Sequence, residues 1–182
     1  PNTLLAHDVG AGKTYVMIAA AMEMRRMGLS EKNMFVVPNN IVGQWKNIFY
    51  AMYPSANILC VEPKSFTPSK RESLLERIRD EDFDGIIIAY SCFERIPLSK
   101  EYYRNRLVYE QELIAEIAGK KNKATSRLKK KQEAVSKALS ELAVAMDDLY
   151  NGVYFDDLGI TRLFVDEAHN FKNCLLYTSP SP

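Results

Sequence analysis

The chain has 182 residues, 47% hydrophobic and 26% charged, with 24 Lys and Arg against 23 Asp and Glu. This length and apolar content suit one α/β domain and exclude wholesale disorder. The net charge of +1 gives no overall preference for nucleic acid. The sequence contains neither an apolar run of about 18 residues that could span a membrane nor a signal-peptide pattern. The three cysteines (Cys60, Cys92, Cys174) form no C-x-x-C pair, which favours a reducing, cytoplasmic location.

Both ends of the sequence are unusual. It opens on Pro1 without a methionine, and residues 174–182 resemble the translated adapter of a sequencing library. We expect residues 1–173 to be one domain truncated at both ends, and residues 174–182 to be a non-native read-through tail. A natural Ser/Pro-rich linker is the alternative for the tail.

Helical and strand patterns alternate along most of the chain. The spacing of apolar residues predicts helices over 16–27, 41–53 and 69–80, and strands over 34–37, 58–61, 85–90 and 163–166. Strands that are apolar throughout and alternate with helices predict an α/β fold whose parallel sheet has helices on both faces. We expect the strands at 85–90 and 163–166 to be the most deeply buried.

The segment at about 100–150 has no strand pattern. Two apolar stripes at helical spacing predict two amphipathic helices, which we interpret as an antiparallel helical hairpin inserted between strands. The expected connection contains no acidic residue but carries a basic cluster: Lys120, Lys121, Lys123, Arg127, Lys129, Lys130 and Lys131. The cluster is either a solvated tip or a contact for DNA phosphates.

The residues Gly10-Ala11-Gly12-Lys13-Thr14 precede the first predicted helix and indicate a phosphate-binding loop. The glycines let the backbone turn so that successive N–H groups face a phosphate, and the helix adds its positive end. Lys13 is placed to neutralise the β- and γ-phosphates, and the Thr14 hydroxyl to hold Mg²⁺. Taken alone, the pattern also fits a helix-capping turn in an unrelated fold.

The residues Asp166-Glu167-Ala168-His169 follow the apolar run at 163–165. A carboxylate at the carboxyl end of a central parallel strand faces the crevice where ligands bind in open α/β sheets. Asp166 is therefore placed to hold Mg²⁺, and Glu167 to orient the water that attacks the γ-phosphate. Finding this pair after a phosphate-binding loop, in the expected order, indicates a nucleotide-hydrolysing site.

The motifs together resemble superfamily-two helicases, especially the Swi/Snf-related branch of DNA translocases. Residues 4–14 resemble the first motif of that branch, residues 36–45 its next motif, residues 87–93 its third segment, and residues 166–169 the DEAH motif. The motif sequences resemble most those of large helicases of phages and conjugative elements, some of which are fused to adenine methyltransferases. The resemblance covers residues 4–173, and the hairpin is its main departure.

The resemblance implies a RecA-like P-loop domain, the N-terminal lobe of an ATP-driven DNA helicase or translocase. It implies that residues 10–14 bind ATP, that Thr14 and Asp166 serve Mg²⁺, and that Glu167 and Lys13 are catalytic. It further implies that His169 couples the nucleotide state to the DNA-binding face. Asn39, Asn40 and Ser91 fall in segments that touch the DNA backbone in relatives, although strand-end capping explains them equally well.

The implied partners are DNA, which we expect to be double-stranded, a second helicase lobe in the same parent chain, and in some parents a methyltransferase domain. Because the second lobe completes the catalytic site, the fragment alone is expected to be inactive. Two other classes stay open: a different P-loop NTPase, and a non-catalytic interaction module that uses the helical hairpin. Trp45, the single tryptophan, is expected to be a packing residue.

Overall fold

The computed structural model describes residues 3–6, 8, 10–120, 126–144 and 152–171. These residues form two compact units. The first unit contains the chain up to Pro97 and from Val153 onward, and the second contains Leu98–Gly152. The predicted tail at 174–182 lies outside the described residues.

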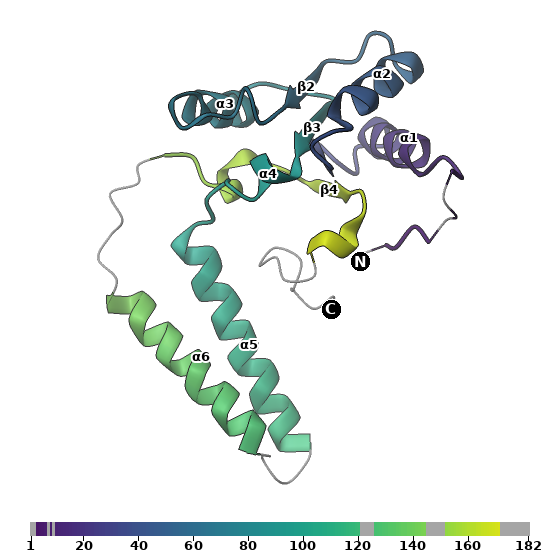
Figure 1. The fold of residues 1–182 in the computed structure, drawn as a ribbon. Helices are drawn as coiled ribbons and strands as arrows, with labels where there is room; N and C mark the ends of the chain where they lie inside the picture. The colour runs from purple at the N-terminus through teal and green to yellow at the C-terminus, as the bar shows by residue number, and fades with distance from the viewer. Residues whose placement is uncertain (1–2, 7, 9, 121–125, 145–151, 172–182) are drawn as a thin grey trace. The chain divides into compact units, whose positions relative to one another are not determined.

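The first unit contains short strands that alternate with helices (Figure 1). Its elements are β1 (Asn33–Val37), β2 (Ile58–Val61), β3 (Gly85–Ala89), β4 (Arg162–Val165), α1 (Lys13–Arg26), α2 (Val42–Met52), α3 (Pro68–Asp80), α4 (Tyr90–Phe93) and the 3₁₀ turns η1 (Phe155–Leu158) and η2 (Ala168–Phe171). The three predicted helices and four predicted strands of this unit are confirmed, with ends that differ from the prediction by three residues at most. The sequence patterns missed α4, η1 and η2, because elements of four residues are too short to show a period.

All four strands are parallel and form one sheet in the order β2-β3-β1-β4. In the register of this sheet, Phe35 of β1 pairs with Ile87 of β3 on one side and with Phe164 of β4 on the other. The predicted parallel sheet is confirmed. A mixed α/β unit with an all-parallel sheet is consistent with a RecA-like domain.

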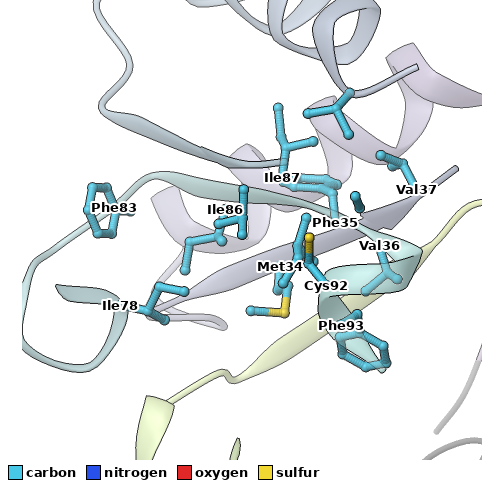
Figure 2. Packing of buried hydrophobic residues seen from close by; sticks show 14 of the residues in the cluster. Met34, Phe35, Val36, Val37, Ile78, Phe83, Ile86, Ile87, Cys92 and Phe93 are labelled. Carbon is cyan, nitrogen blue, oxygen red and sulfur yellow. The ribbon is translucent and has the colours of Figure 1, made fainter. Parts of the chain in front are cut away.

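Helices cover both faces of this sheet. Phe35 points to the face covered by α2, where its ring contacts Trp45 and Phe49 at centroid distances of 5.6 and 5.8 Å. Figure 2 shows Met34, the residue before Phe35 on β1, on the opposite face of the sheet, together with Cys92 of α4 and Ile78 of α3. The alternation along β1 therefore supplies a core to each face, as the period of a strand requires.

β4 differs from its prediction. We expected a central, buried strand, but β4 is the last strand of the described sheet and pairs there only with β1. Its residues Arg162 and Leu163 are exposed, whereas Phe164 and Val165 are half-buried. The apolar composition of β4 suggested burial, but among the described residues no strand covers its second edge.

The second unit consists of two helices that pack on each other, α5 (Lys100–Lys120) and α6 (Ser126–Val144). Among the side chains that the structure describes in this unit, Ile114 of α5 and Val135 of α6 are the buried apolar ones. No helix in the part of the chain that the structure describes has both the length and the apolar character needed to cross a bilayer.

Part of the basic cluster lies on helices, and part lies outside the described residues. Lys129, Lys130 and Lys131 lie on α6 and not in a turn, which corrects their predicted location at the reversal of the two helices. Lys131 forms an ion pair with Glu110 of α5 at 2.7 Å. Lys121 and Lys123 lie outside the described residues.

Candidate functional site

The first half of the site is the turn at residues 10–14. Gly10 and Gly12 have φ angles of +84° and +78°, a left-handed backbone that glycine adopts without a steric penalty. α1 begins within this segment, at Lys13, directly after the two glycines. Its N-cap is Gly12, which has no side chain to cap the first amides of the helix. The start of α1 therefore has the geometry of an anion site.

The surroundings of this turn leave room for a phosphate. Among the described residues, a Cβ atom built on Gly10 meets no atom within 4 Å, and one built on Gly12 meets the Tyr15 ring at 3.8 Å. The Lys13 ammonium group donates a hydrogen bond to the Asp8 carbonyl at 3.2 Å, which holds this side chain over the turn. Ala11 and Thr14 fall in the same stretch, as the sequence predicted, and the residues present fit a bound nucleotide phosphate.

The second half of the site is the pair of carboxylates after β4. Asp166 continues the strand ladder, since its amide donates to the Val36 carbonyl at 3.0 Å. The Glu167 amide donates to the Asp166 carboxylate at 3.1 Å. Glu167 has a φ angle of +47°, a left-handed conformation that costs a non-glycine residue about 1–2 kcal/mol.

His169 lies next to Glu167. Its Nδ1 atom is 3.2 Å from the Glu167 carboxylate, and both side chains are largely exposed. The predicted catalytic carboxylate and the predicted coupling histidine are therefore in direct contact, within one turn of the chain. Because the pair is exposed, its contribution to folding is small.

Charges from both halves act on Asp166. Burial raises the pKa of the Asp166 carboxyl above its ordinary value, and the nearby charge of Glu167 raises it further. The Glu167 amide, the positive charge of Lys13 and a hydrogen bond from Trp45 act in the opposite direction. The positive charge of Lys13 thus lowers the pKa of the carboxyl that follows β4, and a cation added there would likewise favour the ionised carboxylate.

The donor set fits a metal that arrives with a nucleotide. Among the described residues, no group of three or more His, Cys, Asp or Glu side chains could hold a metal by itself. Mg²⁺ in phosphate-transferring sites takes one or two protein oxygens and completes its shell with phosphate and water. The Thr14 hydroxyl and the Asp166 carboxylate are the protein oxygens that such a site would use.

A cluster of aromatic side chains packs on β4, the strand that precedes the two carboxylates. Trp45 is 1% exposed and packs on Phe35, and the Phe35 ring stacks on Phe164 at 5.1 Å. The prediction that Trp45 is a packing residue is confirmed. Sequence reasoning missed one contact to Asp166, the hydrogen bond that the Tyr90 hydroxyl donates to its backbone carbonyl.

The predicted DNA-contacting residues after β1 and β3 lie close together. The Asn39 side-chain oxygen accepts a hydrogen bond from the Ser91 amide at 3.1 Å, so Asn39 caps the start of α4. Asn40 is exposed. The capping alternative is thus observed for Asn39, and contact with DNA stays a prediction. Lys129, Lys130 and Lys131 belong to the second unit.

Comparison with known sequences points to one family. The family described as "Probable helicase domain" matches residues 2–180. The chain is 32% identical over 87 residues to the ATP-dependent helicase fft1 of Schizosaccharomyces pombe, which covers 48% of this chain and 9% of that protein.

A second relative comes from Caenorhabditis elegans. It is a homolog of "SWI/SNF-related matrix-associated actin-dependent regulator of chromatin subfamily A containing DEAD/H box 1", 23% identical over 106 residues. The similar region covers 57% of this chain and 10% of that protein. The chain therefore spans about a tenth of the curated relatives it matches.

Proposed function

Because this chain belongs to the Probable helicase domain family, we propose that it is the ATP-binding lobe of an ATP-dependent DNA helicase or translocase. The observation that carries this proposal is the left-handed turn of Gly10 and Gly12 at the start of α1. The Asp166 and Glu167 carboxylates after β4 supply the second part that nucleotide hydrolysis requires. The names of both relatives agree with this function.

The chain's own residues divide the work. The amides of residues 10–14 bind the phosphates, and Lys13 neutralises charge on the β- and γ-phosphates. The Thr14 hydroxyl and the Asp166 carboxylate hold Mg²⁺, which supplies further positive charge at the phosphates when it is bound. Glu167 accepts a proton from the attacking water and orients it.

His169 is the proposed link between the nucleotide site and a bound nucleic acid. In the proposal, the contact between His169 and Glu167 couples the position of the catalytic carboxylate to the DNA-binding face. Asn39, Asn40 and Ser91 contribute backbone contacts to double-stranded DNA, and Lys129, Lys130 and Lys131 add contacts to phosphates. A second lobe of the parent chain completes the site with arginines, so the chain alone hydrolyses ATP negligibly.

The remaining predictions from the sequence have different support. The family match across residues 2–180 argues against an unrelated P-loop enzyme. The helical hairpin as an insertion, the phage or conjugative host element, the fused methyltransferase and the cytoplasmic location stay predictions. A non-catalytic module stays the alternative, and the intact Lys13 and Glu167 argue against it.

Two substitutions separate binding from catalysis. In the proposed site, Lys13→Ala removes the positive charge that neutralises the phosphates. It should weaken binding of a fluorescent ATP analogue about tenfold or more, which corresponds to the loss of one charge-assisted hydrogen bond. Glu167→Gln keeps the side-chain volume and leaves Asp166 in place, so nucleotide affinity should stay close to that of the unmodified chain.

The measurement is a titration of the chain with the analogue in the presence of Mg²⁺. Lys46→Ala, which removes an exposed lysine of α2, is the matched control and should bind as the unmodified chain does. Equal losses in Lys13→Ala and Glu167→Gln would refute the division of roles. An unmodified chain without nucleotide binding would refute the proposed function for this chain.

A further inference from the structure

The peptide unit that joins Asp166 to Glu167 is fixed on both of its polar atoms. Its carbonyl, which belongs to Asp166, accepts a hydrogen bond from the Tyr90 hydroxyl. Its N–H, which belongs to Glu167, donates to the Asp166 carboxylate at 3.1 Å. A peptide unit held at both atoms cannot rotate without breaking a hydrogen bond.

The conformation that follows this peptide needs such support. Among the described residues, Glu167 is the one non-glycine residue with a positive φ angle, +47°. A left-handed non-glycine residue persists where its surroundings hold it in place. The Asp166–Glu167 hydrogen bond is local and comes from the neighbouring residue. Tyr90 is the contact from a distant segment, 76 residues away along the chain.

Tyr90 is itself well anchored. It is the first residue of α4 and directly follows β3, so the central sheet determines where its backbone lies. The next residue, Ser91, donates its amide to the Asn39 side chain. The side chain of Tyr90 is partly buried, and its hydroxyl approaches Asp166 from an element other than β4. The Tyr90 hydroxyl is therefore a rigid point against which the peptide after Asp166 can be held.

We propose that Tyr90 is a positioning residue that fixes the peptide between Asp166 and Glu167 and thereby the direction of both carboxylates. It touches neither nucleotide nor metal in this role, and it acts through the Asp166 carbonyl. The consequence for function rests on the proposed function, because it presupposes Mg²⁺ at Asp166 and a water at Glu167. The same contact connects the segment of Asn39 and Ser91 with the carboxylates.

Tyr90→Phe tests the proposal, because it removes the hydroxyl and keeps the ring. Tyr53→Phe is the matched control: Tyr53 is also partly buried against the core of the first unit, and its ring contacts Phe49. The first readout is the NMR spectrum of the isotopically labelled 182-residue chain. We expect the Asp166 carbonyl carbon and the Glu167 amide to shift in Tyr90→Phe and to stay in place in Tyr53→Phe.

The second readout is the affinity for a fluorescent ATP analogue, measured with Mg²⁺ and with a chelator. Tyr90→Phe should leave the metal-free affinity unchanged, since residues 10–14 bind the phosphates. It should reduce the gain from Mg²⁺ about two- to tenfold, the range that one hydrogen bond supports. A merely structural loss would lower both affinities together.

The outcomes separate the two proposals. Unchanged signals of Asp166 and Glu167 in Tyr90→Phe would overturn the positioning role, whatever the nucleotide data show. Equal shifts in Tyr90→Phe and Tyr53→Phe would also overturn it, because the effect would then be general. If the unmodified chain gains no affinity from Mg²⁺, the proposed function fails, and the NMR signals alone decide whether Tyr90 holds the peptide.

Discussion

Replacing Gly85 by alanine tests the packing beneath the site. Gly85 begins β3, and a Cβ atom built there lies 2.8 and 3.0 Å from ring atoms of Phe49 and 3.1 Å from the Phe35 ring. Both rings are fully buried, so neither can move into solvent. The new methyl group must therefore displace the cluster in which Phe35 contacts Trp45 and Phe164.

The expected magnitude follows from two opposing effects. Overpacking a buried position costs about 1–3 kcal/mol. Gly85 has no positive φ angle, so alanine also restricts the unfolded chain and returns about 0.4–1 kcal/mol. We expect Gly85→Ala to lower the free energy of unfolding by about 1–2 kcal/mol, which corresponds to about 2–8 °C in Tm at this chain length.

A matched substitution has the opposite sign. Gly43 lies in α2, and a Cβ atom built there meets no atom within 4 Å. Gly43→Ala should therefore stabilise the chain by up to about 1 kcal/mol, the difference in helix propensity. The assay is urea unfolding followed by fluorescence of Trp45, the single tryptophan, which reports on the first unit. A Gly85→Ala chain as stable as the unmodified chain, beside a stabilised Gly43→Ala, would refute the close packing of this cluster.

Three further outcomes are expected. Burial raises the pKa of the Cys92 thiol, so at neutral pH it stays protonated and should react with a thiol reagent far more slowly than in urea, as mass spectrometry of the modified peptides can show. Lys129→Glu with Lys130→Glu should flatten the plot of log duplex affinity against log salt by about 0.9 per lost phosphate contact. Lys64→Glu with Lys70→Glu, at exposed lysines of the first unit, is the control pair. If the salt plots of both pairs coincide with each other, the proposed contact of α6 with DNA is refuted. Phosphate release by the purified chain should stay at background with or without DNA.

Lys131 is left out of that test for a structural reason. Its ion pair with Glu110 joins α6 to α5, so reversing its charge would place two acidic side chains against each other. A loss of DNA affinity in such a variant could come from a disturbed helix pair. Lys129 and Lys130 are exposed, and their substitution tests the surface charge more directly.

The sequence predicted the parts of the fold that depend on local pattern. Four apolar runs became four parallel strands, and β2 has the predicted bounds, Ile58–Val61. The glycine turn at residues 10–14 was predictable for the same reason, since its chemistry lies within five consecutive residues. Trp45 was correctly predicted to be a packing residue from its type alone.

The features that the sequence did not predict depend on residues that are distant along the chain. β4 was predicted to be buried from its composition, yet its exposure depends on whether another strand covers its second edge. The left-handed backbone of Glu167 has no signature in sequence, because glutamate is not a residue that favours it. The hydrogen bond between Tyr90 and Asp166 crosses 76 residues, which no local pattern can show.

The two halves of the site should therefore respond differently to substitution. Lys13 is held by a local turn and by the Asp8 carbonyl five residues away. Asp166 is held by the Val36 carbonyl of β1 and by Tyr90 of α4, so its position depends on segments far apart in the chain. We expect a change within the core, such as Gly85→Ala, to reach Asp166 through Phe35 and Phe164, which directly contact each other, and to affect the locally held glycine turn less. Under the proposed function, we therefore expect core packing to affect metal-dependent nucleotide affinity more than metal-free affinity, because only the former would require the Asp166 carboxylate to be in place.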